Sequence, residues 1–148
     1  MKLSIAMVCA ALVGCGGGDS NVELSLTGQT LGDNARAIVS LYGYNTSVAD
    51  EAATLIESYD LPAAATLDLE IPANPHELID SAHGPTTASE AKYYFAVYVD
   101  VNADGQLCPG DLREDFGADL VTFTTPPSAL SVPMTPIAAN TPCRSAAP

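Results

Sequence analysis

Apolar and polar residues alternate with a period of two along much of this chain. The clearest examples are residues 22–27 and 65–71, in which every second residue is apolar. Successive side chains of a strand point to opposite faces of a sheet, so this alternation is typical of strands with one buried face. Both segments are therefore predicted to be half-buried strands.

Further segments share this pattern or are apolar runs between turns. They are residues 35–44, 54–61, 92–101, 120–124 and 130–134. Residues 92–101 place Tyr93 and Phe95 on one face and Tyr94 and Tyr98 on the other, which predicts the central strand. A short helical turn is predicted at 75–81. The sequence thus predicts an all-β fold, an antiparallel β-sandwich of about seven strands of the immunoglobulin or transthyretin type.

The N-terminus has the pattern of an export signal. A lysine precedes the apolar residues 3–14, which are too few to span a bilayer. Residues 12–15 read Leu-Val-Gly-Cys, which resembles the lipobox of bacterial lipoproteins. That resemblance implies cleavage before Cys15, acylation of Cys15 and a lipid-anchored protein of the bacterial cell envelope. Gly16 stands where an inner-membrane retention signal would have Asp, which favours the outer membrane.

The predicted organisation follows from these patterns. The parts are a signal peptide (1–14), a flexible polar leash after Cys15 (15–21), the β-sandwich domain (22–137) and a C-terminal tail pinned by Cys143 (138–148). The uncharged run 120–143 contains five prolines, so it is not predicted to be a membrane-spanning helix.

The charge balance excludes one class of partner. Eighteen acidic residues against five Lys and Arg give a formal net charge of −13. Such a chain has no basic patch that could neutralise phosphates, so we predict no nucleic-acid binding. The expected partners are the membrane, through the lipid, and a protein of the envelope.

Two cysteines remain once Cys15 is lipidated and Cys9 is removed with the signal peptide. In an exported protein, Cys108 and Cys143 are most simply explained as a disulfide. A metal pair or a redox couple is the alternative, but the chain lacks the CxxC spacing typical of those sites.

Residues 100–111 carry the one motif with a specific chemistry. Oxygen-bearing side chains occupy the first, third, fifth and twelfth places, and Gly105 occupies the sixth, as in an EF-hand loop. This spacing predicts a calcium site, in which Gln106 offers its backbone carbonyl. The predicted ligands are Asp100, Asn102, Asp104, Gln106 and Asp111.

The loop resembles those of dockerins, although Asp111 replaces the usual glutamate and a strand enters where an EF-hand has a helix. The chain holds one such repeat and dockerins hold two, so cohesin recognition is not implied. The alternative is an Asx-rich turn without an ion, because Asp, Asn and Gly dominate turns.

A second resemblance rests on the order of the strands. The Leu-Ser-Leu-Thr-Gly segment (24–28), Ala-Ile-Val-Ser-Leu (37–41), Glu-Ile-Pro (70–72) and Tyr-Phe-Ala-Val (94–97) are similar in order to small β-sandwich lipoproteins that include type III secretion pilotins. The resemblance covers about residues 22–101. It implies an envelope lipoprotein and carries over no binding residue.

No catalytic residue is predicted. Asp80, Ser81 and His83 are near neighbours, but the chain has no G-x-S-x-G elbow, and neither His76 nor His83 has the spacing of a zinc site. We therefore predict a non-enzymatic binding or assembly module. The alternative is a carbohydrate-binding or degradative accessory lipoprotein, for which four tyrosines would have to be exposed: Tyr42, Tyr44, Tyr94 and Tyr98.

Overall fold

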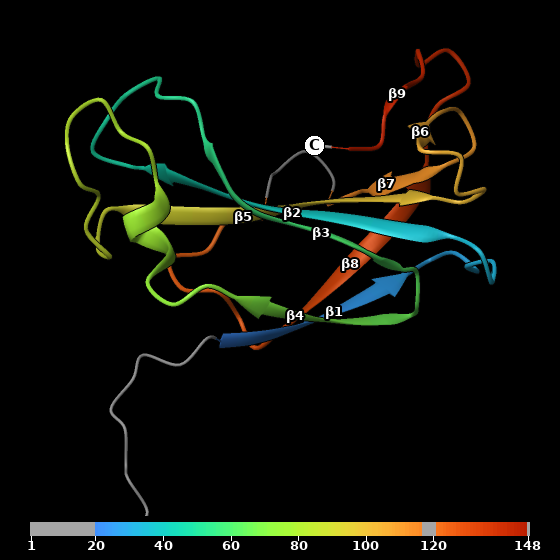
Figure 1. Ribbon diagram of the computed structural model, residues 1–148, viewed down its shortest axis with the longest axis horizontal. Helices are drawn as coiled ribbons and strands as arrows, with labels where there is room; N and C mark the ends of the chain where they lie inside the picture. Colours follow the sequence, from blue (N-terminus) through green and yellow to red (C-terminus); the bar gives the residue numbers. More distant parts are fainter. Residues whose placement is uncertain (1–19, 117–120, 148) are drawn as a thin grey trace, which may run out of the picture.

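The computed structural model describes residues 20–116 and 121–147, and within them the fold is a β-sandwich. A seven-stranded sheet in the order β3-β2-β5-β7-β8-β1-β4 curls so that β3, β2 and β5 form one layer and β1 and β4 the other, while β8 runs diagonally between the two layers (Figure 1). A second sheet pairs β6 with β9. The all-β sandwich of about seven strands predicted from the alternation is confirmed.

The described elements have the following bounds. They are β1 (Ser20–Thr27), β2 (Arg36–Asn45), β3 (Thr54–Pro62), β4 (Thr66–Ile71), the 3-10 helix η1 (Pro75–Leu78), β5 (Ala91–Asp100), β6 (Gln106–Leu107), β7 (Leu112–Glu114), β8 (Ala129–Pro136) and β9 (Arg144–Ser145).

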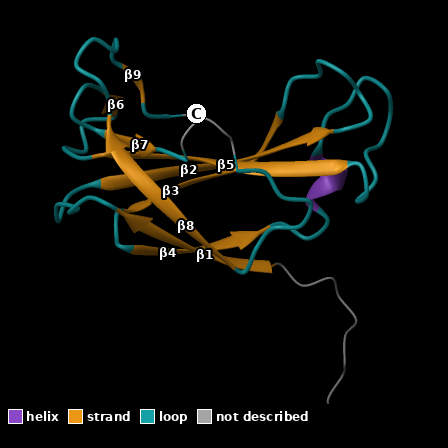
Figure 2. Ribbon diagram, turned by 180° about the vertical axis from the view of Figure 1, so that it is seen from behind, coloured by secondary structure: helices purple, strands orange, loops and turns teal. Residues whose placement is uncertain are grey.

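Strand direction departs from the expected antiparallel arrangement at one pairing. The other strand pairings among the described residues are antiparallel, but β1 and β8 run parallel, with Leu24 opposite Leu130. Figure 2 shows the same arrangement from behind. Alternation of apolar residues is identical in parallel and antiparallel strands, so the sequence carried no signal for this pairing.

The core lies between the two layers. Strands β1 and β4 bury every second side chain, and β5 buries Tyr93, Phe95, Val97 and Val99 as the alternation predicted. On β2, Ile38 is also buried on the opposite face. It packs there in a second apolar cluster with Leu107, Ile137 and Ala146.

The predicted strand at 120–124 is wrong over the residues that the structure describes. Phe123 makes an isolated bridge to Tyr93, and no strand forms around it. Pro126 and Pro127 follow directly, and proline cannot donate to a strand ladder. The predicted helical turn is confirmed in shorter form as η1, but Asn74 makes no side-chain capping bond and adopts φ 52°.

Residues 1–19 lie outside the described residues, and so do the predicted signal peptide and the lipidation site at Cys15. Within the described ranges, the structure contains no helix that is both long and apolar enough to span a membrane.

Candidate functional site: the acidic loop and the tyrosine face

Strand directions assign the loops to two ends of the sandwich. Strands β5 and β8 are each antiparallel to β7, and β8 is parallel to β1, so β1, β5 and β8 all run the same way. We call the end where they finish the distal end, because it lies opposite Ser20, where β1 begins. The loop after β5, residues 100–111, lies at this distal end (Figure 1). We refer to it as the acidic loop.

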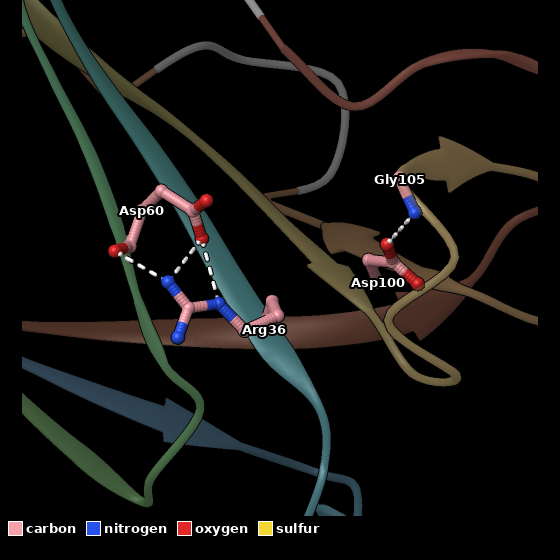
Figure 3. Close-up of polar contacts among 4 residues, drawn as sticks. All are labelled: Arg36, Asp60, Asp100 and Gly105. Atoms are coloured by element: carbon pink, nitrogen blue, oxygen red, sulfur yellow. Dashed lines mark hydrogen bonds and ion pairs between the residues drawn. The ribbon is translucent and has the colours of Figure 1, made fainter.

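Two carboxylates of the acidic loop are buried and accept backbone hydrogen bonds. Asp100 is 2% exposed, and one of its oxygens accepts from the N–H of Gly105 at 2.8 Å (Figure 3). Asp111 is 5% exposed and accepts from the N–H of Val101 at 2.9 Å and of Cys108 at 2.7 Å. The two side chains therefore fix the beginning and the end of the loop.

The other predicted ligands lie on the exposed side of the loop. The carboxylate of Asp104 accepts from the N–H of Gln106 at 2.8 Å and from the amide of Asn102 at 2.9 Å. Gly105 adopts φ 79°, the positive value expected at the sixth place, and Ala103 adopts φ 56°. The bond from the N–H of Gln106, together with one from the N–H of Asp104 to the side-chain oxygen of Asn102 at 3.2 Å, is that of linked Asx turns, the alternative to a calcium site.

The acidic loop offers donors of the kind that a hard cation prefers. Carboxylate and amide oxygens are the ligands that calcium prefers. The described residues nevertheless contain no group of three or more His, Cys, Asp or Glu side chains placed to hold a metal ion. Asp100 and Asp111 are buried carboxyl groups, and no ion pair with a basic side chain is found for them in the described ranges. A cation there would supply the opposite charge that a buried carboxylate requires.

The predicted disulfide is present and ties the tail to the acidic loop. Cys108 and Cys143 are bonded, with Cα atoms 4.3 Å apart. The tail then pairs as β9 with β6, and the Arg144 guanidinium lies 4.5 Å from the ring centroid of Tyr98. Ala146 is buried against the outer face of β2. The tail thus covers part of the sheet, which the sequence did not indicate.

A cavity of about 520 Å³ lies between the acidic loop, the tail and the outer face of β2 and β3. Asp100 lines it together with Arg36 and Asp60. The guanidinium of Arg36 is paired with the Asp60 carboxylate at 2.9 Å and also donates to the Asp60 carbonyl at 2.8 Å (Figure 3). Arg36 therefore neutralises one acidic side chain at this wall.

The four tyrosines of the alternative hypothesis lie on one face. Tyr42, Tyr44, Tyr94 and Tyr98 are all half-buried on the outward side of β2 and β5, whereas Tyr93 belongs to the core. The rings of Tyr42 and Tyr94 stack with centroids 5.2 Å apart and planes 14° apart. We call this surface the tyrosine face. The four rings are partly exposed to solvent.

Asp80, Ser81 and His83, for which no catalytic role is predicted, follow one another near the opposite end of the sandwich, where Asp80 bonds to Thr54 at the start of β3. The hydroxyl of Ser81 accepts a hydrogen bond from the backbone N–H of His83 at 3.3 Å, as in a local turn. His76 belongs to η1 and lines a separate cavity of about 300 Å³ beside Ser20.

Comparisons with known proteins add one structural likeness. No family model matches the chain, and no curated protein matches it. A solved structure of an alternative pilotin from the type II secretion system of Vibrio cholerae aligns with 14% identity and a TM-score of 0.46. The alignment covers 80% of this chain and 96% of that chain.

Proposed function

We propose that this protein is a lipid-anchored component of the bacterial envelope, most consistent with the outer membrane, and that its β-sandwich is a non-enzymatic binding or assembly module. The observation that carries the proposal is the short distance between the lipobox and the fold. Strand β1 begins at Ser20, five positions after Cys15. A lipid on Cys15 would therefore hold one end of the sandwich against the membrane.

The strand directions then determine which end of the anchored domain lies farther from the membrane. The distal end carries the acidic loop, the disulfide and the tail. Strand β5 has 10 residues and rises about 3.3 Å per residue, so this end would stand about 30 Å from the membrane-proximal end. We propose that calcium binds the acidic loop there and stiffens it for contact with a protein partner.

The anchor is tested by replacing Cys15 with serine. We expect the variant to fractionate with the soluble envelope contents while the parent stays with the membrane, because acyl chains supply the apolar area for stable attachment. The measurement is immunoblotting of washed membrane and soluble fractions. A Ser20→Ala variant, which keeps the lipobox, serves as the control and should remain membrane-bound. Membrane retention of Cys15→Ser after a high-salt wash would contradict the anchor.

Carbohydrate binding is the second candidate function, and the tyrosine face is the observation that favours it. Half-exposed rings on adjacent strands offer apolar surface for stacking, together with hydroxyls for hydrogen bonds. The large negative charge of the chain favours a neutral saccharide over an acidic one.

This second candidate predicts that Tyr42→Ala and Tyr94→Ala each weaken binding of a neutral hexasaccharide such as cellohexaose by about tenfold, as loss of one stacking contact of about 1.4 kcal/mol implies. Isothermal titration calorimetry measures the effect. Leu78→Ala is the matched control, because Leu78 is 48% exposed and lies on η1, outside the tyrosine face. Absence of binding to a panel of neutral hexasaccharides would remove this candidate.

A further inference from the structure

The curled sheet ends in two strands that each have a single partner among the described residues. Strand β3 pairs with β2, strand β4 pairs with β1, and the two terminal strands are joined by the short turn 63–65. A terminal strand presents backbone N–H and C=O groups that no neighbouring strand pairs. We call the region between the free edges of β3 and β4 the seam.

A side-chain hydrogen bond bridges the seam. The hydroxyl of Tyr59 on β3 donates to the backbone carbonyl of Glu70 on β4 at 2.6 Å. Burial, and then the charges of Glu57 and Glu70, raise the pKa of Tyr59 to about 12, so the hydroxyl remains a donor at neutral pH. The carbonyl of Glu70 is thus satisfied by a side chain and not by a strand.

Both edges of the seam are acidic. Glu57 and Asp60 on β3 and Asp68 and Glu70 on β4 are exposed, and Arg36 pairs with Asp60. Like charges repel a second copy of the same edge, which protects an open strand from self-association. The three of these carboxylates for which the described ranges show no ion pair, Glu57, Asp68 and Glu70, attract a strand that carries lysine or arginine.

We propose that β3 binds an extended, basic polypeptide segment as an added strand. Strand β3 has 9 residues, against 6 in β4, and its proline stands at the last position; the carbonyl of Asp60 already accepts from Arg36, so an added strand would pair with the part of β3 before Asp60. The N–H of Ser58 donates to the carboxylate of Glu57 at 3.2 Å, an exposed acceptor that an incoming carbonyl can replace. The backbone ladder would supply affinity, and the acidic side chains would select basic partners.

This inference extends the proposed binding role by adding a second surface, the free edge of β3, and by naming the chemistry of the segment that binds there. It rests on that role but not on the lipid. Fractionation of Cys15→Ser and the binding experiment below can therefore fail independently of one another.

The test uses the full-length chain in detergent and a nine-residue peptide of alternating lysine and valine. Calorimetry should detect binding, and hydrogen exchange should show slower exchange of amides within residues 54–62. A peptide of the same sequence with N-methyl groups on alternate residues keeps the charge but cannot complete a ladder. We expect it to bind at least tenfold more weakly and to give no protection of β3.

Charge-reversal variants distinguish binding at the seam from nonspecific attraction of a basic peptide to an acidic protein. Glu57→Lys should weaken binding of the basic peptide at least fivefold, whereas Glu77→Lys, the same change at an exposed acid of η1, should alter it less than twofold. Equal binding of the two peptides, or protection at any other surface, would overturn the proposal. Self-association of the chain with protection of β3 in the absence of peptide would likewise assign the edge to a second copy.

Discussion

Replacing both Cys108 and Cys143 by serine is expected to lower the free energy of unfolding by roughly 3 to 4 kcal/mol. The bond closes a loop with a sequence separation of 35 residues, and in the chain-entropy model that closure removes many conformations from the unfolded ensemble. For a domain of this size the midpoint of thermal unfolding should fall by about 10 to 15 °C. Urea denaturation of the parent and the double variant measures the difference directly.

The loss of stability in the double variant should be greatest at the distal end. Without the bond, the tail is held by the short β6–β9 pairing, the Arg144–Tyr98 contact and the burial of Ala146. Amides around Gln106 and Arg144 should therefore exchange faster even where the sandwich stays folded. Treatment of the parent with a reductant serves as the control and should reproduce the variant. Equal urea midpoints for the parent and the double variant would show that packing alone holds the tail.

The long strands were predictable because each one buries a single face. In β1, β4 and β5 the apolar positions follow the strand period, and the observed bounds differ from the predicted ones by one or two residues. The same parity placed Tyr94 and Tyr98 on the face opposite Phe95, where the structure has them.

The short elements could not be predicted in this way. Strands β6 and β9 have 2 residues each and β7 has 3, too few for a periodic pattern to appear. They form because the disulfide and the second apolar cluster bring the acidic loop and the tail together over Ile38. These contacts join segments far apart in the sequence, so no local pattern reports them.

The acidic loop, too, was predictable only in part. The motif placed a glycine at the sixth position, and Gly105 there adopts a positive φ that a Cβ would resist. It did not predict that Asp100 and Asp111 are buried and bonded to backbone N–H groups, since burial depends on the sheet and the tail that surround the loop. The motif therefore predicted where the loop and its glycine turn lie, but not how the side chains of Asp100 and Asp111 are arranged.

Calcium is expected to stabilise the fold by roughly 2 kcal/mol at about 5 mM, if it binds with a dissociation constant of about 0.1 mM, which is typical of weak extracellular sites. The midpoint of thermal unfolding of chelator-stripped protein should then rise by about 7 to 10 °C. Magnesium should raise it much less, because its strict octahedral shell fits a flexible loop of many oxygens poorly.

Substitution at Asp104 distinguishes the contribution of calcium binding to stability from that of the Asx turns. Asp104→Asn keeps an oxygen that can accept the N–H of Gln106, so the fold without calcium should be nearly as stable as the parent, while the loss of one charged ligand should largely remove the calcium-induced rise. Asp80→Asn makes the same change at an exposed acid outside the loop and should leave the rise intact. If calcium and chelator give the same melting curve in the parent, the hydrogen bonds of Asp100 and Asp111 suffice to hold the loop, and the buried carboxylates need no cation.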